Sequence, residues 1–143
     1  MIGSDLGIFV GQWDVRVLLP GESVVARSVF EWILDGRYLA QRTEVPIPEA
    51  PDTLGIIAVG PDGATYTQHY YDSRGVTRVY AMTFNDGIWT LIREAADFSP
   101  FDFAQRFTGT FSADGDRIDG AWEKALPGAG WELDFELSYT RIS

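Results

Sequence analysis

The sequence contains no cysteine and a single histidine, His69. The absence of cysteine excludes a disulfide scaffold, thiolate zinc sites, iron–sulfur ligation and a cysteine nucleophile. It also fits a reducing compartment. One histidine cannot build a multi-histidine metal site, and no acidic segment has the spacing of a calcium-binding loop. We therefore expect no metal site.

Basic residues and long apolar runs are also scarce. Lysine occurs once, at Lys124, and the formal net charge is −10, so the chain lacks the clustered basic residues with which proteins bind nucleic acid. No run approaches about 18 consecutive apolar residues, which excludes a transmembrane helix. Residues 1–6 show no basic segment of a signal peptide. We expect a soluble, cytoplasmic protein that binds neither nucleic acid nor a membrane.

Turn-forming residues and β-forming segments alternate along the whole chain. The 143 residues suit one domain, 1–143. Runs rich in Val, Ile, Thr and aromatic residues are separated by Pro-Gly, Asp-Gly and Asn-Asp-Gly turns about every 8–12 residues, which is typical of an all-β sandwich or barrel. The predicted strands lie near residues 12–19, 23–34, 37–45, 53–60, 64–71, 76–84, 88–95, 103–112, 117–125 and 131–141.

Turn type fixes the register of a hairpin, and the register fixes which side chains share a face. An Asp-Gly loop at 114–115 pairs Phe107 with Trp122 on one face and Arg106 with Glu123 on the other. The first face is apolar and the second carries an ion pair. A half-buried hairpin needs this division, and it supports the predicted register.

The first and last strands both alternate between apolar and polar residues. The apolar face of the first strand carries Trp13 and Val15, and that of the last strand carries Leu137 and Tyr139. Two half-buried terminal strands can pair with each other and so remove the open edges of the sheet. We therefore predict a single antiparallel up-and-down β-barrel of about ten strands. A two-sheet sandwich would show similar alternation and is the alternative.

The predicted interior of the middle strands is polar as well as aromatic. The loop at 86–87 places Tyr80 opposite Arg93, with Arg78 on the same inward face. Inward arginines are unusual because buried charge is costly unless it is paired or hydrated. Since a barrel of this size can hold a small ligand, we predict a ligand pocket. Its predicted lining is Gln41, Thr43, Gln68, Tyr70, Arg78, Tyr80, Trp89 and Arg93. Alternatively, the arginines pair with acids at the barrel mouth.

The turn at 72–75 allows two registers. A type I turn followed by a left-handed Gly75 leaves a three-residue loop and pairs Tyr70 with Arg78. A two-residue loop would instead bring His69 and Tyr71 into the pocket. We favour the first register.

The favoured register also predicts apolar side chains on the outer face of neighbouring strands. Contiguous exposed apolar surface usually marks an interface. We therefore predict a homodimer through Ile57, Val59, Tyr71, Val79 and Ala81.

Short motifs resemble those of a known group of barrels. Gly11-Gln12-Trp13 opens the first strand, and Arg141 ends the last strand on the parity of Trp13. This resembles the Gly-x-Trp signature of the lipocalin and calycin barrels, in which the tryptophan closes one barrel end beneath a basic side chain. The similarity implies structural roles for Trp13 and Arg141.

Longer stretches look similar to an uncharacterised bacterial family of calycin-like barrels. These stretches are 69–76, 106–109, 120–123 and 131–135. The resemblance implies the barrel and structural roles for Trp122 and Glu123, but no activity, because a fold does not confer a function. The related nitrobindin-type barrels hold haem through a histidine near the C-terminus. Residues 139–143 contain none, so we expect no haem unless His69 replaces that ligand.

These observations leave three hypotheses for the function. The first is a barrel that binds a small molecule, for which inward arginines favour an anionic or carboxylate-bearing apolar ligand. The second is a dimeric structural or interaction module with a filled barrel. The third is an enzyme acting in the cavity through His69, oriented by Asp72. No Gly-x-Ser-x-Gly elbow accompanies Ser73, and we assign no catalytic residue.

Overall fold

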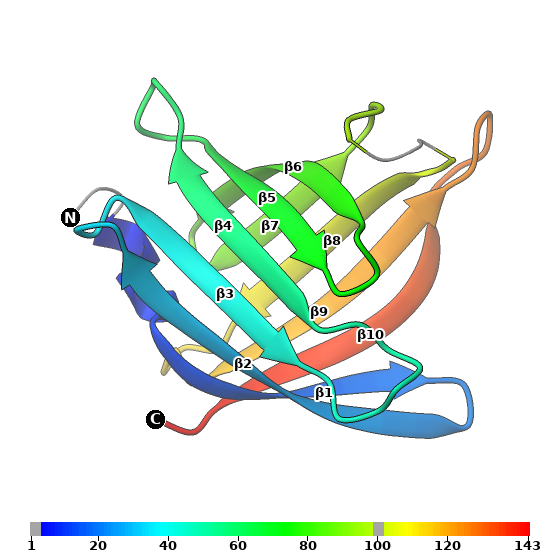
Figure 1. The fold of residues 1–143 in the computed structure, drawn as a ribbon, viewed down its shortest axis with the longest axis horizontal. Coiled ribbons are helices and arrows are strands. Elements are labelled where there is room, and N and C mark those ends of the chain that lie inside the picture. Colours follow the sequence, from blue (N-terminus) through cyan, green and yellow to red (C-terminus); the bar gives the residue numbers. More distant parts are fainter. Residues whose placement is uncertain (1–3, 99–101) are drawn as a thin grey trace.

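Ten antiparallel strands, each paired with its neighbours in the sequence, close into one barrel (Figure 1). This computed structural model describes residues 4–98 and 102–143. A short 3-10 helix, η1 (Ser4–Phe9), precedes the strands. The strands are β1 (Gly11–Leu19), β2 (Glu22–Ile33), β3 (Tyr38–Glu44), β4 (Thr53–Val59), β5 (Tyr66–Asp72), β6 (Thr77–Asn85), β7 (Ile88–Arg93), β8 (Ala104–Phe111), β9 (Arg117–Ala125) and β10 (Glu132–Arg141).

The barrel closes where β1 pairs with β10, and this pairing decides against the sandwich. Trp13 lies opposite Arg141 and Val17 lies opposite Leu137. The predicted fold class is therefore confirmed, and no predicted strand end differs from the observed one by more than two residues. The described residues include no helix with the length and apolarity needed to cross a bilayer.

The hairpin registers follow from the turns as predicted. Between β8 and β9, Phe107 pairs with Trp122 and Arg106 with Glu123. On the outer face, Arg106 Nε lies 2.9 Å from Glu123 Oε1. The half-buried hairpin is thus apolar inside and ion-paired outside, which fixes its register because a one-residue shift would exchange the two faces.

The β5–β6 hairpin adopts the favoured three-residue loop. Gly75 has φ +83°, which L-residues with a side chain rarely adopt. Its amide donates to the carbonyl oxygen of Asp72 at 2.9 Å, and Tyr70 pairs with Arg78. The alternative register is therefore wrong, and both His69 and Tyr71 lie on the outer face of the barrel.

One part of the predicted dimer face is wrong. Ile57 is 1% exposed inside the barrel, and Val59 packs against the same core. The residues between Thr53 and Gly60 are almost all apolar, so their pattern does not distinguish an inner from an outer face. Tyr71, Val79 and Ala81 remain on the outer face, and the dimer stays a prediction.

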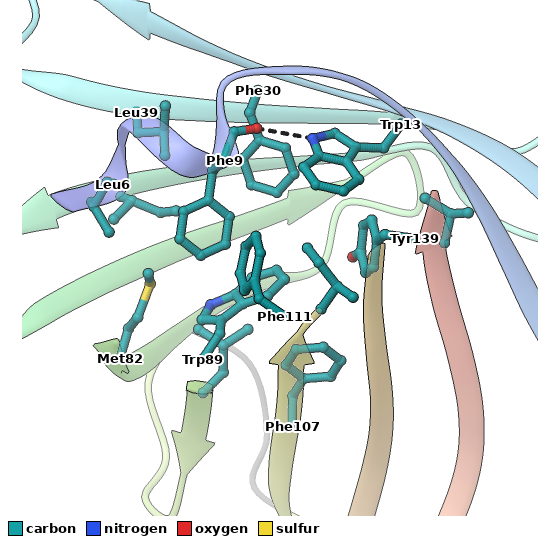
Figure 2. Packing of buried hydrophobic residues seen from close by; sticks show 14 of the residues in the cluster. Leu6, Phe9, Trp13, Phe30, Leu39, Met82, Trp89, Phe107, Phe111 and Tyr139 are labelled. Atoms are coloured by element: carbon teal, nitrogen blue, oxygen red, sulfur yellow. Dashed lines mark hydrogen bonds between the residues drawn. The ribbon is translucent and has the colours of Figure 1, made fainter. Parts of the chain in front are cut away.

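Helix η1 closes one end of the barrel, at the left of Figure 1. Its last residue, Phe9, is fully buried among the aromatic side chains that Figure 2 shows converging from several strands. The Phe9 carbonyl oxygen accepts a hydrogen bond from Trp13 Nε1 at 2.9 Å. The sequence analysis missed this helix, which fills the closed end with rings instead of solvent.

Arg141 seals the same end from outside. Its guanidinium carbon lies 4.1 Å from the centroid of the Trp13 ring, a cation–π geometry. It also donates to the carbonyl oxygen of Val10 at 2.7 Å and forms an ion pair with Asp116 at 3.0 Å. Trp13 and Arg141 therefore have the structural roles that the motif implied.

Candidate ligand-binding cavity

The half of the barrel opposite η1 is hollow. A cavity of about 480 Å³ occupies it, which lies within the range of small-molecule sites. Its lining includes Pro51, in the β3–β4 connection, and Asp134, near the start of β10, and both of these segments lie toward the right of Figure 1. The cavity is lined by Val15, Val17, Gln41, Thr43, Pro51, Thr53, Gly55, Gln68, Tyr70, Arg74, Arg78, Tyr80, Trp89, Leu91, Phe103, Gln105, Phe107, Trp122, Asp134, Phe135, Leu137 and Tyr139.

Most of the predicted pocket residues lie in this lining. Those that do are Gln41, Thr43, Gln68, Tyr70, Arg78, Tyr80 and Trp89. They share the lining because each occupies an inward position of its strand and the hairpin registers align those positions. The turns between β5, β6 and β7 therefore place the predicted residues together.

Arg93 is the exception, because it binds an acid instead of lining the cavity. Its side chain is 2% exposed, and its Nε and Nη2 atoms each lie 2.9 Å from a carboxylate oxygen of Asp97. The Asp97 carboxylate also accepts the backbone N–H of Val79 at 2.8 Å. The hydrogen bonds that Arg93 donates to the Asp97 carboxylate raise the pKa of Arg93 further. For this arginine, the alternative of pairing with an acid is correct, and its role is to attach the segment after β7 to β6.

Arg78 is the arginine that remains for a ligand. Its Nε atom is buried without a hydrogen-bond partner, and none of the ion pairs among residues 4–98 and 102–143 includes it. Its guanidinium carbon lies 6.0 Å from the centroid of the Tyr70 ring. Burial raises the pKa of the Tyr80 hydroxyl, while the charge of Arg78 acts in the opposite direction. The cavity wall therefore carries a positive charge that forms no ion pair with an acid of the described segments.

Tyr70 is held in the wall by the turn that follows β5. Its hydroxyl donates to Asp72 Oδ2 at 2.8 Å, and Arg74 Nη2 donates to the same oxygen at 2.6 Å. The Asp72 side chain is completely buried. Burial by itself raises the pKa of Asp72, but the hydrogen bonds from Arg74 and Tyr70 outweigh it and hold that pKa at about 2. Burial and the Asp72 carboxylate together raise the pKa of Tyr70. Tyr70 is therefore a neutral donor whose proton is already used.

A hydrogen-bonded layer crosses the inner end of the cavity. Gln68 Nε2 donates to Gln41 Oε1 at 3.2 Å, and Gln41 Nε2 donates to Ser28 Oγ at 3.2 Å and to Tyr139 Oη at 3.3 Å. The Ser28 and Thr43 hydroxyls lie 3.0 Å apart. Burial raises the pKa of Tyr139 to about 12, although the bond from Gln41 opposes the shift. We call Gln41, Gln68, Thr43 and Tyr139 the polar floor of the cavity.

The sequence analysis missed the apolar part of the lining. Phe107 and Trp122 face inward as predicted, with ring centroids 5.2 Å apart, but we had assigned them to ordinary core. Leu91, Phe135 and Leu137 line the same cavity. Inward apolar residues follow the same alternating pattern whether they meet another side chain or an empty volume. The pattern therefore predicted their direction but not the cavity.

His69 does not reach this site. It lies between Gln68 and Tyr70, which both line the cavity, so the alternation of the strand points its imidazole outward. A proton transfer by His69 inside the cavity is thus excluded by direction. Among the described residues, no three histidine or acidic side chains come close enough to hold a metal ion.

No protein-family model matches the chain, and no curated protein matches it. The fold is similar to the crystal structure of Rv2717c from M. tuberculosis, with a TM-score of 0.68. The two sequences are 14% identical over 98% of this chain and 96% of the other. At this identity the similarity extends to the fold alone. It supports the ten-stranded barrel and leaves the function to the site itself.

Proposed function

We propose that this protein is a small-molecule-binding barrel whose ligand is an elongated apolar molecule with a carboxylate at one end. The observation that carries the proposal is Arg78, a cation in the wall of a mostly apolar cavity, without an acidic partner among the described residues. The same proposal places the chain among the calycin-like barrels, since the Gly-x-Trp motif and the closed barrel agree with that group.

The charges around the mouth support an anionic ligand. The guanidinium of Arg74 is neutralised by Asp72 at 2.6 Å. Asp134 is also part of the lining. A bound anion is therefore attracted toward Arg78 and repelled from Asp134, which favours one orientation of the ligand. Arg78 presents planar N–H donors of the kind that bind carboxylates in pairs.

The walls support an apolar body for the ligand. Trp122, Phe107 and Leu91 line the cavity from β9, β8 and β7. Removing apolar surface from water contributes about 25 cal/mol per Å², so these walls supply most of the affinity and Arg78 supplies orientation. An open, mostly apolar volume with few polar groups is the usual form of a small-molecule site. A barrel that served as a filled interaction module would have side chains in this volume.

Two measurements test the proposal. Native mass spectrometry of the protein as purified reports any retained molecule, and a discrete added mass of a carboxylic acid is the expected result. Isothermal titration with decanoate then compares the unmodified protein with Arg78→Gln. We expect affinity to fall about tenfold or more, because a charge-assisted hydrogen bond would be lost.

Arg42→Gln is the matched control. Arg42 lies on the outer face, where it forms an exposed ion pair with Glu31 at 3.3 Å, and its removal changes the net charge by the same amount. Decanoate affinity should be nearly unchanged in this variant. An equal loss in both variants, or no loss in Arg78→Gln, contradicts the assignment of the carboxylate to Arg78.

A further inference from the structure

The polar floor is unusual because its polar groups are almost completely removed from solvent. Gln41 is 8% exposed, Gln68 is 5% exposed and Tyr139 is 7% exposed. Burial of amide and hydroxyl groups is costly unless they form hydrogen bonds. The floor also lies directly above the aromatic rings around Phe9, since Trp89 contacts both Phe9 and Tyr139. An apolar floor would have packed against those rings without this cost.

The hydrogen bonds within the floor leave specific groups free. Both N–H groups of the Gln41 amide are used, one by Ser28 and one by Tyr139. Tyr139 therefore accepts in that bond, and its own proton remains to be donated. Ser28 also accepts from Gln41, and its hydroxyl shares a hydrogen bond with that of Thr43 in which either oxygen can donate. Among the described residues, no group donates a hydrogen bond to Gln68 Oε1, while the Gln68 nitrogen is bound to Gln41.

The unsatisfied groups are members of the cavity lining. Gln68 and Tyr139 both line the hollow half. Gly55 gives Gln68 the room to reach this position, since a side-chain carbon at residue 55 would lie 2.2 Å from Gln68 Nε2. The floor thus offers the cavity a hydroxyl donor from Tyr139 and an amide acceptor from Gln68. A hydroxyl group on a ligand, which both donates and accepts, matches this combination.

The depth of the cavity limits the length of a ligand that reaches the floor. Phe135 lies near the mouth and Tyr139 lies on the floor, both on β10. Four residues of strand span about 13 Å, and a strand tilt of roughly 35–45° reduces this to about 10 Å along the barrel axis. An extended medium-chain acyl group has about this length. It can therefore reach the floor from the mouth of the cavity.

We infer that the polar floor selects ligands that carry a hydroxyl group at the end opposite the carboxylate, so that the ligand class is the medium-chain ω-hydroxy acids. This inference rests on the proposed function, because it assumes that a carboxylate is held at Arg78. An unsubstituted acyl chain fills the same volume but leaves the Tyr139 and Gln68 groups without partners. The floor therefore distinguishes the two ligands in two ways: it forms hydrogen bonds with a terminal hydroxyl, and an apolar chain end leaves its own polar groups unpaired at a cost in free energy.

The test compares decanoate with ω-hydroxydecanoate by isothermal titration calorimetry. We expect the unmodified protein to bind ω-hydroxydecanoate about tenfold more tightly. In Gln68→Met, which keeps the length and volume of the side chain, the ratio of the two affinities should fall to about one. Arg78→Gln is the control, because it should weaken both ligands by the same factor and leave the ratio unchanged.

The outcomes separate this inference from the proposed function. If both acids bind equally to the unmodified protein and both depend on Arg78, the inference is overturned and the proposed function stands. If neither acid binds, or Arg78→Gln has no effect, the proposed function fails and the inference fails with it. If Gln68→Met does not fold, Tyr139→Phe removes one oxygen from the floor and gives the same comparison. A preference for ω-hydroxydecanoate that survives both variants would overturn the role of the floor.

Discussion

Phe9 is the residue on which closure of the barrel end should depend most. It is the last residue of η1, it is fully buried, and its ring centroid lies 5.0 Å from those of Trp89 and Phe111 and 5.1 Å from that of Phe84. Phe9→Ala removes the ring from the centre of this cluster. The neighbouring rings belong to strands of the closed barrel, so they cannot move far to fill the space.

The expected loss can be worked out from this geometry. Replacing a buried phenylalanine with alanine costs about 3–5 kcal/mol, through lost transfer free energy and the cavity that remains. The entropy of unfolding is about 2.1 cal/mol/K per residue. For this chain of 143 residues it is about 0.3 kcal/mol/K. The melting temperature should therefore fall by about 10–17 °C.

Differential scanning calorimetry and urea unfolding measure the change directly. Ile8→Ala is the control, since Ile8 is the preceding residue of the same helix but is 37% exposed, and we expect it to cost less than about 1 kcal/mol. A loss below about 1 kcal/mol in Phe9→Ala, or equal losses in the two variants, would refute the reasoning. Helix η1 would then be a loosely attached segment and not the closing element of the barrel.

Two further predictions concern the open half. The pKa of Asp72 is lower in the folded chain than its usual 3.8. Its ionised form therefore stabilises the fold by about 2 kcal/mol above about pH 4, and this contribution disappears as the pH falls toward 2. In urea unfolding, Asp72→Asn should lose about this amount at pH 7 and approach the unmodified protein near pH 2; a difference that does not depend on pH contradicts the assignment. Gly55→Ala should displace the Gln68 side chain and reduce the preference for ω-hydroxydecanoate, while the melting temperature changes by only a few degrees; an unchanged preference would count against the position of Gln68.

The turns explain why so much of the fold could be predicted. The segment from Asp72 to Gly75 specifies its loop through one left-handed glycine, and the loop determines which residues of β5 and β6 face inward. A turn that requires a left-handed glycine can be recognised in a sequence. The turn at 72–75 therefore predicted that Gln68, Tyr70 and Arg78 lie on one wall, without any knowledge of tertiary contacts.

The errors occurred where the determining contact is distant or the pattern is uniform. Helix η1 has only six residues, too few to be stable without the barrel end that it fills. Ile57 lies in a strand whose residues are nearly all apolar, so alternation gave no direction. Arg93 was assigned to the pocket because its direction was known, but Asp97 lies in the irregular segment after β7 and its approach could not be predicted.

The contrast between Arg93 and Arg78 is the strongest argument that the open half is a site. Both arginines lie on inward positions of neighbouring strands. Arg93 has Asp97 from its own chain, as a buried guanidinium requires, whereas Arg78 has an uncovered charge facing a cavity with apolar walls. The Nε atom of Arg78 is buried without a hydrogen-bond partner, which costs the fold free energy that an acceptor on a ligand would recover. The carboxylate of the proposed ligand would supply that acceptor, and the low polarity of the walls would strengthen its bond to Arg78. The feature that weakens the empty barrel is therefore the one that would hold its ligand.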